Sequence, residues 1–600
     1  MSASDDASPQ LFWADDGSPR SGRFGDVYFS KDDGLAETRA VFLQGCGLPD
    51  AWTGRDRFTV AELGFGTGLN IIALIDLWRR HRPDGGRLHV FSVEGFPVTA
   101  DEARRALAAW PEMSPIAEAL LAAWPPSTPG FHRIDLPAFG VTLDLAVGEV
   151  EWTLSQWDGM ADSWFLDGFS PALNPAMWSA QVMALVAARS APDARLATFT
   201  VAGFVRRALT EQGFTVEKRP GHGRKRERLE ARRDGAPRPL PRRRIAVVGA
   251  GIAGAAAVRA LTADGHEVVL IEQDRPGAGA SGFPASLVTP RLDAGDAVIA
   301  GLHAQALLRA AQLYRDVPGA VLAQGVMQLE QAPRDAARFA KVAAQDIWTD
   351  GAMTTLDAAT CAQRMGEPVQ TGGLFMRDAL AIQSAPVLEA WLAGAASRLT
   401  AQVARLERID AGWRLLDAQD ALIAEVEVVV IAAGWGSAAL ADLGLSPVRG
   451  QADWVEGVTA PPVAWGGYAA PTPSGLLFGA THDRGQTDCE PRPEDSERNR
   501  QTLAARLPAL AGRIERTGVR RRAAVRATTP DRLPLAGQLQ DGLFVLTGLG
   551  SRGFCLAPLL GEHVAALVSD TPSPLPRAFA ERLRPDRHLS LAQPTVKVDA

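Results

Sequence analysis

Two stretches of the chain combine a short apolar run, a glycine-rich turn and a helical pattern, as parallel β/α units do. In the first, residues 58–63 (FTVAEL) predict a buried strand and residues 69–80 (LNIIALIDLWRR) predict a helix. In the second, residues 244–248 (RIAVV) predict a strand and residues 255–265 predict a helix. Because each unit begins anew after its own glycine turn, the pattern predicts an α/β protein with two independent nucleotide-binding sheets.

The segment between the two patterns has the composition of a linker. Residues 230–244 (EARRDGAPRPLPRRR) contain three prolines and many charges but no apolar periodicity. We therefore predict a first domain at residues 1–230, a basic proline-rich linker at 231–244 and a second domain at 245–600.

Length and composition fit a multidomain globular protein. The 600 residues are 46% hydrophobic and 22% charged, enough to bury more than one core. The chain has no uncharged apolar run of about 18 residues, and its first ten residues are acidic, so we expect a cytoplasmic protein with neither a membrane span nor a signal peptide. The four cysteines lie far apart, without redox-pair or zinc spacing, and we expect no metal.

Charge is unevenly placed along the chain. The net charge is −7, yet residues 219–244 hold 11 Arg or Lys against three acidic residues, which is +8 locally and leaves −15 for the rest. Such a segment suits a local contact with a polyanion, and it equally suits a solvated linker. Charge alone leaves both interpretations open.

The first glycine turn has the spacing of a nucleoside site. Gly64, Gly66 and Gly68 follow a strand that contains Glu62, and the next predicted strand ends in Glu94, thirty residues past Gly64. An acid at that position accepts hydrogen bonds from ribose hydroxyls, although glycines also serve tight turns that bind nothing. The alternating glycines differ from G-x-G-x-x-G and resemble motif I of methyltransferases that use S-adenosylmethionine (SAM).

Asp167 is the candidate catalytic group of this half. It ends a predicted strand in residues 163–178 (SWFLDGFSPALNPAMW), and ligands of open α/β sheets bind at the carboxyl ends of strands. A carboxylate there can orient an amine toward a sulfonium methyl group and take up the proton that the amine loses. The alternative is that Asp167 caps the following turn, since DG and SP are turn-forming pairs.

The second half carries the dinucleotide fingerprint in its required context. Gly249, Gly251 and Gly254 separate strand from helix, and the next strand ends in Glu272, 23 residues beyond Gly249. A nicotinamide dehydrogenase would normally continue with further β/α units, whereas this chain runs at once into residues 277–290 (GAGASGFPASLVTP), which include Ser281. FAD is therefore favoured over NAD as the cofactor. That segment resembles the flavin-contacting loop of the D-amino-acid oxidase and glycine oxidase family.

Two later segments suit a return to the FAD-binding part. Residues 428–437 (VVVIAAGWGS) supply a strand and a turn with Gly434. Residues 541–554 (DGLFVLTGLGSRGF) supply another strand and a turn with Gly550 and Gly553, whose backbone N–H groups could face the flavin ring. We predict FAD-binding parts at about 245–290 and 425–570 and an α+β substrate part at about 291–424 and 450–525.

An arginine should position the substrate of the second half. Residues 525–537 (VRATTPDRLPLAG) fall where glycine-oxidase-like enzymes carry the Arg that clamps the substrate carboxylate, which nominates Arg526. The alternatives are that Arg526 pairs with a structural acid or contacts RNA. Arg552 is the second candidate for the clamp.

Several blocks of the chain resemble one family, that of the bacterial tRNA 5-methylaminomethyl-2-thiouridine biosynthesis bifunctional proteins. The likeness spans about residues 12–570. The blocks are DVYFS (26–30), GLAETRAVFL (34–43), ELGFGTGLN (62–70), WFLDGFSPALNPAMW (164–178), FTVAGFVRRAL (199–209), GRKRE (223–227), GASG (279–282), VRGQ (448–451) and GSRG (550–553).

The resemblance implies roles for individual residues. Asp167 would be the catalytic carboxylate, Glu94 would hold the SAM ribose and Glu149 would reach the adenine, although the family pattern has Asp there. GRKRE would begin the last strand of the methyltransferase sheet. Its basic residues would then bind substrate near the site's mouth; they are Arg224, Lys225 and Arg226. Phe283 departs from the pattern, which has Asn after GASG.

The resemblance also implies the architecture and the reaction. A Rossmann-like SAM methyltransferase domain would precede an FAD-binding Rossmann domain with an α+β substrate domain. The partner would be tRNA, and we expect a monomer. The FAD domain would convert 5-carboxymethylaminomethyl-2-thiouridine at the wobble position into a primary amine, which the SAM domain would methylate. Competing interpretations are an amino-acid oxidase fused to a small-molecule methyltransferase, and a non-catalytic RNA-binding scaffold.

Overall fold

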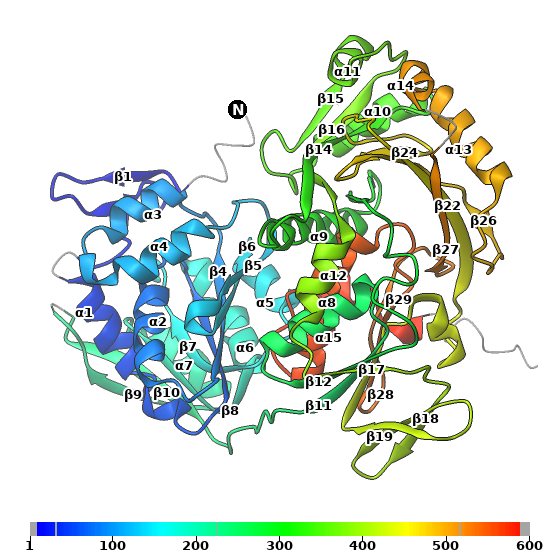
Figure 1. The fold of residues 1–600 in the computed structure, drawn as a ribbon. Helices are drawn as coiled ribbons and strands as arrows, with labels where there is room; N and C mark the ends of the chain where they lie inside the picture. The colour runs from blue at the N-terminus through cyan, green and yellow to red at the C-terminus, as the bar shows by residue number, and fades with distance from the viewer. Residues whose placement is uncertain (1–8, 31–32, 224, 515–517, 588–600) are drawn as a thin grey trace, which may run out of the picture. The chain divides into compact units, whose positions relative to one another are not determined.

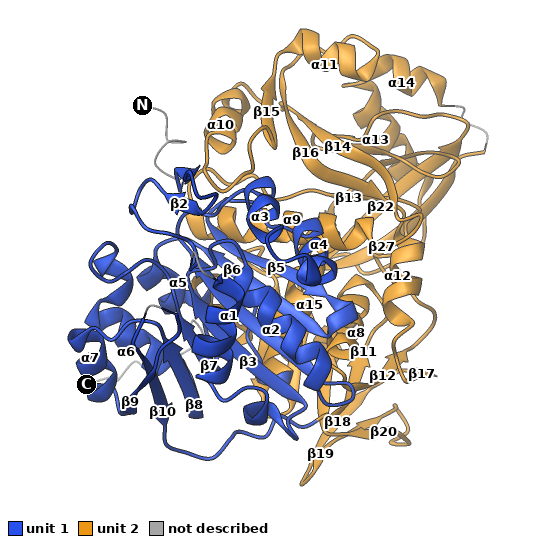
Figure 2. Cartoon of the chain, turned by 90° about the vertical axis from the view of Figure 1, so that its left-hand side faces the viewer, with its two compact units in different colours: residues 1–241, 569–577 blue, residues 242–568, 578–600 orange. Residues whose placement is uncertain are grey.

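The computed structural model describes residues 9–30, 33–223, 225–514 and 518–587 (Figure 1). The chain divides into two compact units, residues 1–241 with 569–577 and residues 242–568 with 578–600 (Figure 2). In the part of the chain so described, no helix is long and apolar enough to cross a membrane.

Unit 1 is built on one eight-stranded sheet with the order β5-β6-β4-β3-β7-β8-β10-β9. Its five central strands run parallel, and β5, β10 and β9 pair antiparallel. Its strands are β3 Arg57–Leu63, β4 Arg87–Glu94, β5 Gly130–Leu136, β6 Val141–Val147, β7 Ala161–Leu166, β8 Ser190–Thr198, β9 Phe214–Pro220 and β10 Glu227–Arg233.

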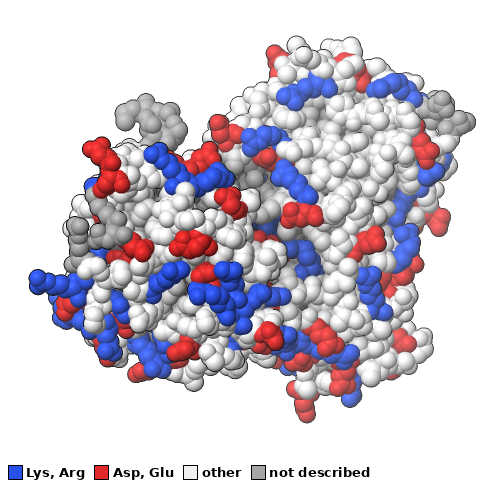
Figure 3. Space-filling view, turned by 60° about the vertical axis from the view of Figure 1, so that its left-hand side comes forward, with Lys and Arg blue, Asp and Glu red and all other residues white. Residues whose placement is uncertain are grey.

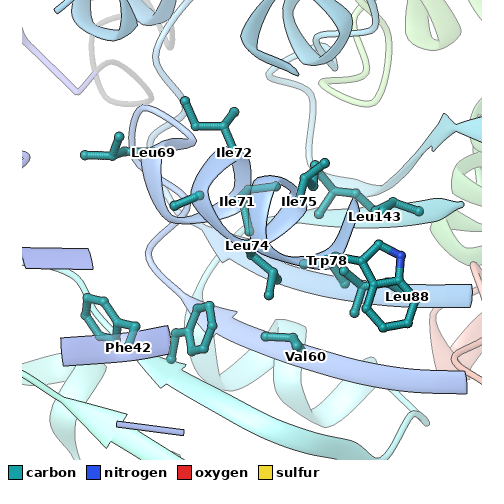
Figure 4. Close-up of a cluster of buried hydrophobic side chains, with 14 of the residues drawn as sticks. Phe42, Val60, Leu69, Ile71, Ile72, Leu74, Ile75, Trp78, Leu88 and Leu143 are labelled. Atoms are coloured by element: carbon teal, nitrogen blue, oxygen red, sulfur yellow. The ribbon is translucent and has the colours of Figure 1, made fainter. Parts of the chain in front are cut away.

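Helices cover both faces of this sheet because alternate strand residues point to opposite sides. Val60 joins one hydrophobic cluster with α2 and α4, whereas its neighbour Ala61 joins another with α5, α6 and α7. Figure 4 shows the first cluster, in which side chains of α2 lie against Val60, Leu88 and Leu143 of the sheet. The helices are α1 Gly34–Thr38, α2 Leu69–His81, α3 Ala100–Leu107, α4 Ser114–Ala122, α5 Val150–Gln156, α6 Ala180–Ala188 and α7 Gly203–Glu211.

The linker is shorter than the sequence pattern predicted. Residues 231–233 continue β10 and pair with β9, and residues 231–232 also pair with β8, so the irregular segment runs only from residue 234 to 243. Pairing with two neighbouring strands extends β10 despite its charges, because its polar side chains can point to solvent. The linker's end is also anchored, since the Arg57 guanidinium donates to the carbonyl of Leu240 at 2.7 Å.

Unit 2 contains a six-stranded nucleotide-binding sheet with the order β17-β12-β11-β21-β29-β28. The pair β17–β12 was not expected, because residues 397–400 fell in the predicted substrate part. A separate small sheet, β18-β19-β20, lies in the same segment of the chain. These strands are β11 Arg244–Val248, β12 Glu267–Glu272, β17 Ser397–Thr400, β18 Arg405–Ile409, β19 Gly412–Leu416, β20 Leu422–Val426, β21 Val428–Ile431, β28 Leu535–Gln540 and β29 Leu543–Thr547.

A larger mixed sheet forms the other part of unit 2, with the path β13-β16-β14-β23-β24-β25-β22-β26 and with β15 and β27 paired beside it. Its strands are β13 Ser286–Val288, β14 Val321–Leu329, β15 Met353–Leu356, β16 Gly373–Ile382, β22 Ser446–Glu456, β23 Val463–Ala464, β24 Tyr468–Pro471, β25 Gly475–Gly479, β26 Asp483–Arg484 and β27 Arg520–Thr528. The main helices of unit 2 are α8 Ile252–Ala263, α9 Ala297–Arg315, α10 Arg334–Ala343, α11 Ala358–Met365, α12 Ser384–Leu392, α13 Pro493–Ala504 and α15 Gly553–Ser569.

Candidate active sites

The first glycine turn brings two strand ends together. Gly64 follows β3 with a positive φ of 86°, and a Cβ at this position would lie 2.9 Å from the Cα of Gly168. Gly168 directly follows Asp167 at the end of β7. Glycine is therefore required where the turn after β3 passes the turn that carries Asp167.

Glu94 faces this turn from the end of β4. One carboxylate oxygen accepts the backbone N–H of Gly66 at 2.9 Å, and the other accepts that of Phe96 at 2.9 Å. Burial raises the pKa of Glu94, while these hydrogen bonds lower it. The carboxylate is thus fixed in direction, and its remaining lone pairs can accept hydrogen bonds from ribose hydroxyls.

Asp167 is held by an amide that the sequence did not single out. Asn70, in the first turn of α2, donates through Nδ2 to Asp167 Oδ2 at 2.7 Å and to Glu62 Oε1 at 3.0 Å. The Thr38 hydroxyl donates to Asn70 Oδ1 at 2.7 Å, which sets the orientation of the amide. The Ser92 hydroxyl donates to the other oxygen of Glu62.

Glu62 lies behind this network and does not line the cavity. It is fully buried, and both of its oxygens have protein partners. Burial raises its pKa to about 8, and the hydrogen bonds from Ser92 and Asn70 act in the opposite direction. We predicted that Glu62 contacts the cofactor; the side-chain contacts that the structure shows for it are with Asn70 and Ser92.

Asp167 itself borders open space. Burial raises its pKa to about 6, and the hydrogen bond from Asn70 lowers it. A carboxyl group with this pKa is mostly ionised at pH 7 and can accept a proton from a neighbouring amine.

A cavity of about 580 Å³ joins the two acids. Asn70, Glu94 and Asp167 line it, together with Glu149 at the start of α5. Among the lining residues that we did not predict are Asp26 and Tyr28, although the block that holds them carried part of the family resemblance. Their position in the cavity wall depends on how the N-terminal segment packs against the sheet, which the sequence pattern does not show.

The N-terminal segment closes the cavity with aromatic rings. Phe24 stacks on Phe169 with ring centroids 4.8 Å apart, and Tyr28 meets Phe169 edge-on at 5.3 Å. Asp26 ties the segment to the turn after β7, because its carboxylate accepts the backbone N–H of Ser170 at 2.9 Å. An apolar lid over carboxylates suits a ligand that has both an aromatic base and polar groups.

Of the three predicted basic residues, Lys225 lines this cavity. Its ammonium pairs with Glu37 at 2.9 Å, lies 4.1 Å from the Phe199 ring centroid and lowers the pKa of Asp167. Arg226 is exposed and does not line the cavity, and Arg224 lies outside the described residues. Residues 225–226 precede β10, whereas we had placed them within the strand.

The second glycine turn, in unit 2, follows β11. A Cβ at Gly249 would lie 2.6 Å from the carbonyl oxygen of Ala432, and one at Gly254 would overlap the carbonyl of Gly249. Gly251 forms the N-cap of α8. Glu272, at the end of β12, accepts the backbone N–H of Ala250 at 2.7 Å. The turn, helix start and acid therefore lie together as dinucleotide binding requires.

The predicted flavin loop is tied to both parts of unit 2. The Ser281 hydroxyl accepts the backbone N–H of Ile252 at 2.9 Å. From β27, the Arg522 guanidinium donates to four loop carbonyls; these belong to Gly277, Ala278, Gly279 and Gly282. Phe283, the departure from the family pattern, packs against an apolar cluster of Ala285 and Leu477.

The later turns also meet this region of unit 2. Gly434 follows β21 with a positive φ, and its carbonyl accepts the Thr547 hydroxyl at 3.0 Å. Gly550 has a positive φ of 55°, and Gly553 begins α15. A Cβ at Gly553 would lie 3.3 Å from the side chain of Ile252, so this turn lies against the start of α8.

The two candidate arginines have different surroundings. Arg526, on β27, donates to the carbonyl of Thr481 at 3.1 Å and lowers the pKa of Tyr468, which burial raises to about 12. Tyr468 is thus a neighbour of Arg526 that sequence reasoning missed. Arg552 donates to the Thr289 hydroxyl and lines a cavity of about 540 Å³, which Arg526 does not line.

Comparison with known proteins decides the family. Residues 244–567 match the model of FAD dependent oxidoreductases, and residues 111–234 match that of S-adenosyl-L-methionine-dependent methyltransferases. A tRNA 5-methylaminomethyl-2-thiouridine biosynthesis bifunctional protein MnmC from Caulobacter sp. (strain K31) is 56% identical over 98% of this chain and 99% of its own. The chain belongs to the MnmC family.

A second MnmC relative agrees with this assignment, and a solved structure shares part of the fold. The MnmC protein of Maricaulis maris is 43% identical over 96% of this chain and 96% of its own. L-proline dehydrogenase from P. horikoshii has a similar fold, with a TM-score of 0.51 and 17% identity over 58% of this chain and 98% of the dehydrogenase. As an MnmC member, the chain is a bifunctional enzyme with FAD and SAM as cofactors, and the predicted α/β architecture is confirmed.

Proposed function

We propose that this chain completes 5-methylaminomethyl-2-thiouridine at the tRNA wobble position in two steps, first in unit 2 and then in unit 1. The observation that carries the proposal is the Asp167–Asn70 pair, a carboxylate that an amide holds at the cavity that Glu94 also lines. It suits methylation of a primary amine, which is the group that the oxidoreductase step would release. Because the substrate is tRNA, we place the enzyme in the cytoplasm.

In the first step, the bond between nitrogen and the carboxymethyl carbon is oxidised. The carbon gives up a hydride and the nitrogen a proton, and hydrolysis of the resulting imine leaves the primary amine and glyoxylate. Bound FAD supplies the hydride acceptor. For this step unit 2 needs to position the substrate, and a guanidinium can do so through two parallel hydrogen bonds to the carboxylate. Arg526 and Arg552 are the residues we propose for this contact.

In the second step, Asp167 would accept a hydrogen bond from the amine and then the proton lost on methylation. Bound SAM supplies the methyl group. Glu94 would hold the ribose hydroxyls, and Glu149, which lines the cavity at the start of α5, would reach the adenine. The aromatic rings over the cavity would exclude water and hold the two reacting groups together.

Substrate RNA would be contacted locally. Basic and acidic side chains are interspersed on the face shown in Figure 3, which argues against a general nucleic-acid coat. Lys225 at the cavity and the exposed Arg226 beside it are the contacts we propose in unit 1.

Mass analysis of wobble nucleosides tests the proposal. Purified enzyme incubated with tRNA that carries 5-carboxymethylaminomethyl-2-thiouridine should yield the aminomethyl nucleoside without SAM and the methylaminomethyl nucleoside with SAM. An unchanged starting nucleoside under both conditions would refute the proposed function.

A further inference from the structure

The 540 Å³ cavity of unit 2 has a strongly basic lining. Residues from the loop after β13, from β14, from the segment that leads into α10, from α10 itself and from the GSRG turn surround it. The lining residues include three arginines, Arg291, Arg338 and Arg552, and one acidic residue, Asp293. The described lining therefore carries a net charge of +2, which favours an anionic ligand.

Arg552 is the least compensated of the three. Among the described residues, the Thr289 hydroxyl is the only hydrogen-bond partner of its guanidinium, and no carboxylate lies within ion-pair distance. Burial lowers the pKa of Arg552. A desolvated cation without a counter-ion is costly, so the inner end of the cavity is suited to one negative group.

The other two arginines stand at the rim. Arg291 pairs with Asp293 at 3.1 Å and Arg338 with Asp335 at 3.1 Å, and their side chains are 39% and 43% exposed. The carboxylate of Asp335 is shared between Arg338 and two backbone N–H groups, those of Gln331 and Ala332, which lie at 2.9 and 3.0 Å. Both guanidinium groups keep N–H donors directed to solvent or to a ligand.

We propose that this rim is a phosphate-binding subsite that holds the RNA backbone next to the modified uridine during the oxidoreductase step. The inference rests on the proposed function. One guanidinium satisfies a substrate carboxylate, so a small amino acid would leave the remaining N–H donors of Arg291 and Arg338 without a ligand. The other anions of an RNA substrate are its phosphodiesters, and Arg291 and Arg338 are placed to meet them at the entrance.

The test compares Arg338→Gln with Arg334→Gln. Arg334 is exposed at the start of the same helix, α10, and does not line the cavity, so it is a matched control for loss of one charge. Two substrates are used: tRNA that carries 5-carboxymethylaminomethyl-2-thiouridine, and the same free nucleoside, which has no phosphate. Flavin absorbance and Tm report whether each variant remains folded and loaded.

Arg338→Gln should raise KM for the tRNA roughly two- to fivefold, as loss of an exposed ion pair does, and leave KM for the nucleoside unchanged. The slope of log KM for tRNA against log salt should fall by about 0.7, the value for one single-stranded phosphate. Inorganic phosphate should compete with tRNA in the wild type and less so in Arg338→Gln. Arg334→Gln should match the wild type throughout.

Equal effects of the two variants would overturn the subsite, as would equal effects of Arg338→Gln on both substrates or an unchanged salt slope. Competition by inorganic phosphate that is as strong against the nucleoside as against tRNA would identify a site for free anions instead. A wild-type enzyme that oxidised neither substrate would refute the proposed function itself, which distinguishes the two failures.

Discussion

At the scale of single residues, the pKa of Asp167 sets the pH at which methylation can proceed. Burial raises it to about 6, above the ordinary range of an aspartate, and the ionised form is the one that accepts the amine's proton. The rate of methyl transfer should therefore lose no contribution from this group above its pKa, and it should decrease as the pH falls through about 6 and Asp167 becomes protonated. Rates measured between pH 5 and 8 with aminomethyl-tRNA check this.

Asp167→Asn is the matching variant, since it keeps the shape and removes the base. Turnover should fall by at least about 100-fold, the smaller end of general-base contributions. If the variant kept both its rate and the acid limb, another group would be the proton acceptor.

Asn70 should act on the rate through Asp167. Its hydrogen bond lowers the pKa of Asp167, so Asn70→Leu should move the acid limb of the pH profile to higher pH and reduce turnover. Thr38→Val should cause a smaller shift in the same direction, because the amide then loses only its orienting partner. Rates that fell equally at every pH would point to a general loss of structure.

At the scale of elements, the loop at residues 277–282 depends on one strand residue. Arg522 on β27 donates to four of its carbonyls, whereas its neighbour Arg521 is exposed, and successive strand residues point to opposite faces. Arg522→Gln should weaken FAD binding about tenfold or more, the effect of losing charge-assisted hydrogen bonds of roughly 1.5–3 kcal/mol.

Flavin titration, followed by absorbance, measures this effect, with Arg521→Gln as the matched control. The control should bind FAD as the wild type does. Equal affinities in both variants would mean that the loop keeps its conformation without the guanidinium.

The glycine turns could be predicted because the constraints on them are short-range. Gly64 and Gly249 each stand between a strand and a helix, and the acids at the ends of the next strands, Glu94 and Glu272, have fixed spacings from them. In the structure, each turn has an acid that accepts one of its backbone N–H groups. The fold class followed from the same local pattern.

Features set by pairing between distant segments could not be predicted. The pairing of β17 with β12 joins residues 397–400 to a strand more than a hundred positions earlier, and nothing local marks it. In the sequence, Asn70 is one polar residue within a predicted helix. Its hydrogen bond to Asp167, 2.7 Å between Nδ2 and Oδ2, depends on the packing of that helix beside the end of β7. The length of β10 likewise depends on its two partner strands.

At the scale of the whole molecule, each cofactor turn and its acid belong to one unit. Gly64 and Glu94 lie in unit 1, and Gly249 and Glu272 lie in unit 2. A change at one turn therefore should leave the chemistry of the other unit intact. The order of the proposed reaction then predicts a different accumulated nucleoside for each defect.

Asp167→Asn should accumulate 5-aminomethyl-2-thiouridine from substrate tRNA, because unit 2 remains active. Gly249→Ala should leave the carboxymethylaminomethyl nucleoside unchanged and lose flavin, since its Cβ would lie 2.6 Å from the Ala432 carbonyl. This second variant should still methylate aminomethyl-tRNA.

A mixture of the two proteins should yield the methylaminomethyl nucleoside, because the primary amine is a stable product that can leave one chain and bind another. Mass analysis of nucleosides from the mixture measures this, and failure of two separately active variants to complement would mean that the substrate must pass between sites within one chain.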